Sequence, residues 1–70
     1  MRHKAFLSYS PYEGWFTLKL QVPGLREPVT RKVSQYEIDR IGDMDVSNMA
    51  KAAMHFPNRD HLVQSHRLHV

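Results

Sequence analysis

The sequence contains no cysteine and only three glycines among its 70 residues. Without cysteine there are neither disulfide bridges nor thiolate metal ligands, which excludes the usual reinforcements of a small secreted domain. No apolar run approaches the roughly 18 residues of a membrane-spanning helix, and no charged-then-apolar leader opens the chain. We therefore expect neither a membrane segment nor a signal peptide, and we expect the protein to act in the cytoplasm.

The composition that remains is that of a folded protein, with 41% hydrophobic and 24% charged residues. One domain is expected over residues 1–70, near the lower size limit at which a single core is stable. The charges are unevenly distributed: residues 1–35 hold six basic and two acidic residues, whereas residues 36–60 hold three basic and five acidic ones. Such a chain can present a basic face to phosphates or to an acidic protein, although an unevenly charged solvated surface has the same signature.

Alternation of apolar and polar residues predicts three antiparallel strands in the first half. It is clearest over residues 15–22, where Phe16, Leu18, Leu20 and Val22 would face the core. A partner strand is expected over residues 4–9, joined by a five-residue hairpin loop at 10–14. A third strand is expected over residues 29–33, with Val29 and Val33 pointing inward. Three such strands in succession form a meander.

Helices are predicted to begin directly after the third strand. Ser34 and Glu37 have the spacing of a reciprocal capping box, and Val33 and Ile38 that of a hydrophobic staple. The first helix should cover residues 35–41 and end at Gly42.

A second helix should be capped by Asp45 and end at Phe56, before Pro57. Its predicted inner face carries apolar residues at helical spacing: Val46, Met49, Ala50, Ala53 and Met54. The expected fold is thus α+β, a three-stranded antiparallel meander followed by two short helices packed on one face. Residues 58–70 fit either a third helix or a fourth strand, and their pattern slightly favours the helix.

No set of residues indicates catalysis or a cofactor. Four of the five histidines lie in the last sixteen residues, and His66 and His69 have a spacing that zinc can use. A third ligand and supporting carboxylates are missing, so we expect no metal. No serine lies in a glycine-flanked elbow. A small nuclease built on His55 with Glu37 or Asp60 is the remaining enzymatic alternative.

Basic and aromatic residues gather in the first half and predict a binding surface. Aromatic anchors with surrounding cations suit a protein partner, whereas stacking rings beside lysines suit single-stranded nucleic acid. A third interpretation is that Trp15 only packs over its own hairpin. The residues that we expect to bind are Arg2, Lys4, Tyr9, Tyr12, Trp15, Lys19, Arg31 and Lys32.

A resemblance to a known group of proteins lies in two segments, residues 7–16 (LSYSPYEGWF) and residues 29–35 (VTRKVSQ). They resemble the small host-takeover proteins of bacteriophages, and among these the antitermination proteins. The resemblance covers about half of the chain and includes no diagnostic motif. It implies binding to host RNA polymerase near the RNA exit channel, alone or with an elongation factor, with effects on initiation and termination.

The sequence therefore predicts a non-enzymatic regulator that binds a large host protein complex, with RNA polymerase as the first candidate. Nucleic acid could be contacted as part of that complex. Two alternatives stay open: a module that binds RNA or DNA directly, and an inhibitor of a bacterial defence complex of the CRISPR type.

Overall fold

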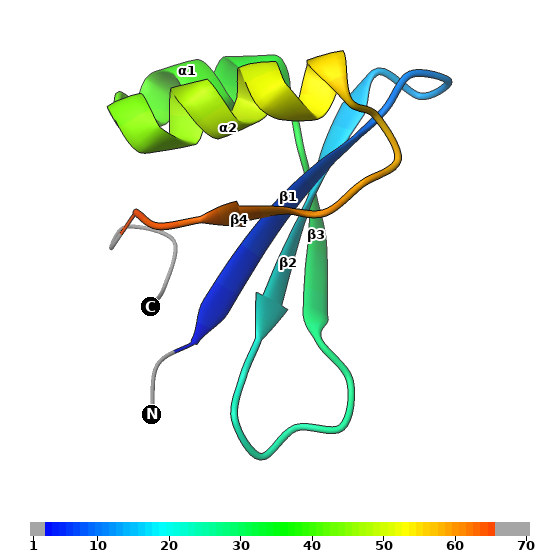
Figure 1. The fold of residues 1–70 in the computed structure, drawn as a ribbon, viewed down its shortest axis with the longest axis vertical. Coiled ribbons are helices and arrows are strands. Elements are labelled where there is room, and N and C mark those ends of the chain that lie inside the picture. The colour runs from blue at the N-terminus through cyan, green and yellow to red at the C-terminus, as the bar shows by residue number, and fades with distance from the viewer. Residues whose placement is uncertain (1–2, 66–70) are drawn as a thin grey trace.

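The computed structural model describes residues 3–65 and shows an α+β fold of two layers, with the helices on one side of a sheet (Figure 1). The elements follow in the order β1 (Lys4–Ser10), β2 (Trp15–Gln21), β3 (Val29–Val33), α1 (Gln35–Ile41), α2 (Met44–His55) and β4 (His61–Val63). The four strands are ordered β3-β2-β1-β4, and all three pairings are antiparallel. The predicted meander and its two helices are confirmed.

The tail is a strand where it is described. The preference for a third helix was wrong for residues 61–63, and residues 66–70 lie outside the described part of the chain. β4 pairs with β1 and sets Val63 opposite Ala5. Both side chains are fully buried, whereas Leu62 points away from the core and is 43% exposed. Pairing with β1 and burial of Val63 outweigh the weak helical pattern of this segment.

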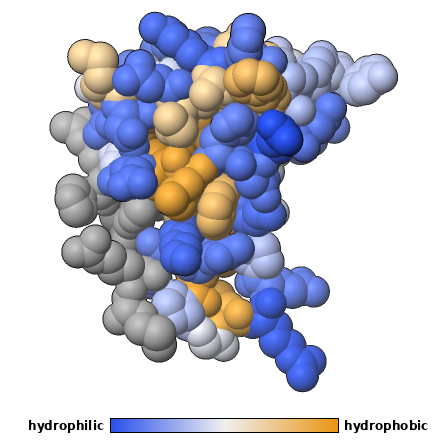
Figure 2. Space-filling model, in the orientation of Figure 1, coloured by the Kyte–Doolittle hydropathy of each residue, from blue (hydrophilic) through white to orange (hydrophobic). Residues whose placement is uncertain are grey.

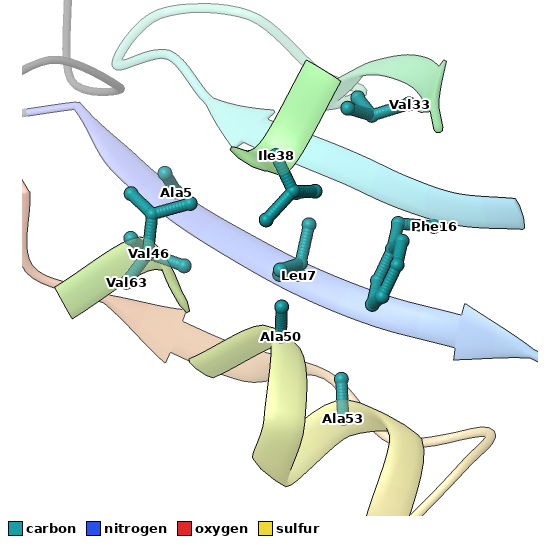
Figure 3. Packing of buried hydrophobic residues seen from close by; sticks show 9 residues of the cluster. All are labelled: Ala5, Leu7, Phe16, Val33, Ile38, Val46, Ala50, Ala53 and Val63. Atoms are coloured by element: carbon teal, nitrogen blue, oxygen red, sulfur yellow. The ribbon is translucent and has the colours of Figure 1, made fainter. Parts of the chain in front are cut away.

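The core lies between the helices and one face of the sheet (Figure 3). α2 packs against β1 and β4, and its alanines allow the backbone of the helix to come close to the sheet. Two predicted core positions are wrong, because Val29 is 49% and Met54 is 48% exposed. The buried residues are Ala5, Leu7, Phe16, Val33, Ile38, Val46, Ala50, Ala53 and Val63.

α1 begins as predicted, with one difference in its cap. Ser34 Oγ accepts a hydrogen bond from the Glu37 amide at 3.2 Å, and Val33 and Ile38 are both buried in the core. The second half of the expected capping box was wrong: the Glu37 carboxylate accepts from the Arg31 guanidinium instead of returning to Ser34. Glu37 therefore ties α1 to β3.

α2 begins two residues earlier than predicted. Its N-cap is Asp43, whose Oδ1 accepts from the amides of Asp45 and Val46 at 2.9 and 3.2 Å. Asp45 is a residue of the first turn, where its carboxylate lies near the positive end of the helix dipole. Either aspartate could cap a helix by residue type, and the earlier start leaves Val46, Ala50 and Ala53 on the buried face as predicted. Within residues 3–65 no helix is long and apolar enough to cross a membrane.

Gly42 separates the two helices in a left-handed conformation, with φ at 66°. Replacing Gly42 with alanine should lower the free energy of unfolding by about 1 kcal/mol, because a Cβ is disfavoured in this region of φ. The space around Gly42 is open, so no steric clash contributes to the effect. Urea unfolding followed by circular dichroism would measure it. Gly42→Asn is the control and should cost less, since asparagine tolerates the left-handed conformation; an equal cost would contradict this explanation.

Candidate functional site

The register of the first hairpin decides on which face its aromatic residues lie. The loop has four residues, 11–14, one fewer than predicted, and it closes with a hydrogen bond from the Gly14 amide to the Ser10 carbonyl. Ser10 therefore pairs with Trp15, and Tyr9 pairs with Phe16. A five-residue loop would instead pair Tyr9 with Trp15. Residues directly opposite each other share a face, so Tyr9 lies on the core side with the buried Phe16. Pairing with Trp15 would have placed it on the opposite face.

The face of the sheet opposite the helices is covered by no described element, and we call it the open sheet face. Its members follow from strand alternation and from the cross-strand register, because residues directly opposite each other share a face. Phe6, Trp15 and Leu62 are apolar or aromatic, and the remaining members are polar or charged. The open sheet face consists of Lys4, Phe6, Ser8, Ser10, Trp15, Thr17, Lys19, Gln21, Thr30, Lys32 and Leu62.

Half of the predicted binding residues lie together on this face: Lys4, Trp15, Lys19 and Lys32. Tyr12 stands at the tip of the adjoining hairpin loop and is 98% exposed.

The other predicted binding residues are separated from this group or cannot be placed. The ring of Tyr9 contacts Phe16 on the core side, with 4.9 Å between ring centroids. Arg31 pairs with Leu18 and also belongs to the helix side. Arg2 lies outside the described residues. The predicted set is thus not one surface.

Acidic residues pair with two of the three lysines of the open sheet face. Lys19 Nζ lies 2.7 Å from a carboxylate oxygen of Asp60, and Lys32 Nζ lies 2.9 Å from one of Glu13. Both pairs are partly exposed, so each contributes only about 0.2–1 kcal/mol to stability. Their larger effect is on the surface field, because each lysine carries its own counter-charge. Lys4 is also on this face and is exposed.

Sequence reasoning missed the two apolar residues Phe6 and Leu62 on the face, and the two carboxylates that pair with its lysines. Phe6 was missed because apolar residues occupy both alternating sets of β1, with Ala5 and Leu7 in the set that faces the helices. Glu13 and Asp60 carry no local signal, since their lysine partners come from other parts of the chain.

Two hollows are also present, and the first borders the open sheet face at Lys4 and Gln21. A wide one of about 600 Å³ is bordered by Lys4, Gln21 and the β2–β3 loop, residues 22–28. A smaller one of about 240 Å³, which we call the β3 groove, lies between β3 and α1. Figure 2 shows apolar residues reaching the surface in the middle of the view, among mostly hydrophilic neighbours. The β3 groove is lined by Leu7, Leu18, Arg31, Val33, Glu37, Ile38 and Ile41.

Within residues 3–65 no group of three or more histidine, aspartate or glutamate side chains could hold a metal ion. The predicted pair His66 and His69 lies outside this range. No family model matches the chain, and neither a curated protein nor a solved structure is similar enough to count as a match.

Proposed function

We propose that this protein is a non-enzymatic regulator that binds a large protein complex through its open sheet face. The observation that carries the proposal is the presence of Phe6, Trp15 and Leu62 on a face that no described element covers. Antiparallel sheets commonly leave one face to solvent, and such a face is then mainly polar. An aromatic and apolar set there, with 43% of Trp15 exposed, has the composition of a protein-binding surface.

The energetic centre of this surface is Trp15, because tryptophan is strongly enriched among residues whose truncation abolishes binding. Tyr12, at the exposed tip of the same hairpin, extends the surface beyond the sheet. The Lys19–Asp60 and Lys32–Glu13 pairs provide a polar border with both signs of charge. Such a border favours a partner surface that also carries both signs, and it supports specificity more than affinity.

Nucleic acid is the second candidate, and the same ion pairs rank it below a protein partner. Rings beside lysines can stack bases and contact phosphates, and Phe6 and Trp15 lie on one face with Lys4, Lys19 and Lys32. A phosphate approaching Lys19 or Lys32, however, also approaches Asp60 or Glu13. The resulting repulsion reduces the gain from each contact, so this arrangement favours a protein partner.

The resemblance to phage antitermination proteins makes bacterial RNA polymerase the partner to test first, alone or with an elongation factor. A regulator of this size acts by occupying part of a functional surface on the larger machine. Docking beside the RNA exit channel would alter initiation and termination without any bond being made or broken by this chain.

Trp15→Ala combined with Lys19→Ala should weaken the capture of RNA polymerase from nuclease-treated bacterial lysate at least tenfold. The tryptophan substitution removes the anchor, and the lysine substitution removes one charge of the border. Surface plasmon resonance with purified polymerase would give the affinity. Tyr36→Ala is the matched control, because Tyr36 is an aromatic residue of α1 that is 68% exposed and lies off the open sheet face. Its affinity should equal that of the wild type.

Naked oligonucleotide separates the two candidates. We expect weak binding to a 15-nucleotide poly-dT strand at 150 mM salt, nearly unchanged in the double variant. Submicromolar binding that falls steeply with salt would support the nucleic-acid module instead, since steep salt dependence reports the release of counterions from phosphates. Unchanged polymerase binding by a folded double variant would exclude the open sheet face as the docking surface.

A further inference from the structure

We propose that the wide hollow beside the β2–β3 loop binds an aliphatic monocarboxylate, either a free carboxylic acid or the C-terminal residue of a polypeptide. We call it the loop hollow; it is bordered by Lys4, Gln21 and residues 22–28. The carboxylate would contact Lys4 and Arg26, and the aliphatic part would lie against the apolar side chains of the loop. The inference does not depend on the function proposed above.

The β2–β3 loop has a defined shape before any ligand arrives. It projects from the end of the sheet where β1 begins, away from both helices (Figure 1). At its start the Leu25 amide donates to the Val22 carbonyl at 3.1 Å, and Gly24 has a φ of 91°. Proline followed by glycine is the pair that such a turn favours, and Pro23 and Pro28 each fix their own φ. A ligand therefore meets a loop whose ordering costs little.

The loop hollow contains two cations without an internal counter-charge. Lys4 and Arg26 both border it and are exposed. Within residues 3–65 neither forms an ion pair, whereas Lys19 and Lys32 each meet a carboxylate. A guanidinium can hold a carboxylate through two parallel hydrogen bonds, and a lysine beside it adds a point charge. The two charges are thus available to an anionic ligand.

Glu27 limits how much negative charge the ligand can carry. Its side chain also borders the loop hollow, so two cations and one carboxylate leave a net charge of +1 there. A single negative charge on the ligand balances this lining. A second one would be repelled by Glu27 without a further cation to meet it. A monoanion therefore fits better than inorganic phosphate, which is largely dianionic at neutral pH.

The rest of the lining selects an aliphatic ligand. Apart from Gln21 it is apolar, and Leu25 is 57% exposed, so a ligand can remove apolar surface from water. The volume of about 600 Å³ lies within the ~300–1,000 Å³ of small-molecule pockets and admits an aliphatic chain beside the carboxylate. Among the described residues that border the hollow none is aromatic. No ring can stack a base there, which disfavours single-stranded nucleic acid.

Hexanoate is the probe for this site. We expect a dissociation constant of about 1 mM at low salt, because exposed ion pairs each contribute little. Nuclear magnetic resonance spectra should show amide shifts centred on residues 24–27. Hexylamine has the same chain with the opposite charge, and acetate has the charge without the chain. Both should bind at least tenfold more weakly than hexanoate.

The tripeptide acetyl-Gly-Gly-Leu with a free carboxylate distinguishes the two sources of the ligand. Tighter binding of the peptide than of hexanoate would identify a polypeptide C-terminus, and the reverse order would identify a free acid. The amidated peptide lacks the charge and should bind at least tenfold more weakly than the free form.

Charge substitutions test which residues hold the carboxylate. Lys4→Gln combined with Arg26→Gln should weaken hexanoate binding at least tenfold. Lys51→Gln is the matched control, because Lys51 is an exposed lysine of α2, and it should leave binding unchanged. Glu27→Gln should strengthen binding at least threefold by removing the like charge. A gain in affinity cannot result from unfolding, so this variant remains decisive even if another is unstable.

Trp15→Ala should leave hexanoate binding unchanged, which separates this site from polymerase docking. Equal affinity for hexanoate and hexylamine would overturn the proposal, as would the absence of amide shifts at a twentyfold excess over the expected dissociation constant. Full binding by the folded Lys4→Gln, Arg26→Gln variant would also overturn it. Tighter binding of a poly-dT strand than of hexanoate at residues 24–27 would assign the hollow to phosphodiesters instead.

Discussion

Phe16→Ala should leave most of the protein unfolded at 25 °C. The Phe16 side chain is 1% exposed, lies on the inner strand β2, and packs against Tyr9 on β1 and Val33 on β3. Truncating a buried phenylalanine costs about 3–5 kcal/mol. A single core in a chain of this length rarely supplies more than about 3–5 kcal/mol of net stability. The cost of the truncation is therefore as large as the whole stability, so far-ultraviolet circular dichroism and urea unfolding should show little or no cooperative transition in the variant.

Trp15→Ala is the matched control for this prediction. Trp15 is the preceding residue of the same strand, but it lies on the open sheet face and is 43% exposed. Its truncation should cost about 1 kcal/mol or less and leave a cooperative unfolding transition. If the two variants lost equal stability, the assignment of the two faces would be wrong. The control also matters for function, because loss of polymerase binding by Trp15→Ala is meaningful only in a folded protein.

Most of the fold could be predicted from local sequence signals. Alternation in β2 is strict enough to place Phe16 on the core side. Ser34 and Gly42 mark the two ends of α1, because a serine cap and a left-handed glycine are needed at those points whatever the rest of the chain does. Such signals depend on neighbouring residues only, and the bounds of β3 and α1 are confirmed without a shift.

The errors occur where distant residues decide between local alternatives. Asp43 and Asp45 are equally good caps by residue type; in the structure Asp43 caps α2, and the Asp45 carboxylate instead accepts from the Gln64 amide, which lies after β4. Leu62 and Val63 give no clear period, and pairing with β1 makes the segment a strand. The hairpin loop was predicted one residue too long, and Tyr9, which was predicted to bind a partner, lies on the core side against Phe16. Only the last of these errors concerns strand register; the first concerns the start of a helix, and the second concerns the choice between helix and strand.

The site was less predictable than the fold for a related reason. Residue types indicated that cations and aromatic rings would gather in the first half of the chain, and Lys4, Trp15, Lys19 and Lys32 do share a face. Sequence could not show that Lys19 meets Asp60, because the two come together only when β4 pairs with β1. The predicted basic surface is therefore a mixed one, which supports the proposed protein partner over the alternative of direct nucleic-acid binding.

The largest effect expected from a polar substitution is that of Asp43→Ala. Asp43 Oδ1 caps α2, and its Oδ2 accepts from the Ser65 hydroxyl at 2.8 Å. Ser65 is buried, at 5% exposure, in the segment that follows β4. Loss of a cap costs about 1 kcal/mol. Loss of the hydrogen bond from the Ser65 hydroxyl to this charged acceptor adds about 1–3 kcal/mol. Urea unfolding should thus show a loss of about 2–4 kcal/mol, close to the whole stability of the protein.

Ser34→Ala gives the cost of a cap alone, because the Ser34 side chain accepts only the Glu37 amide among the described contacts. That variant should lose about 1 kcal/mol. Asp43→Asn should be milder than Asp43→Ala, since asparagine is an equally good cap and can still hydrogen-bond Ser65. A double-mutant cycle of Asp43→Ala with Ser65→Ala should give a coupling energy of about 0.5–3 kcal/mol. Strict additivity would show that the α2 cap and the segment after β4 are energetically independent, despite the 2.8 Å contact between them.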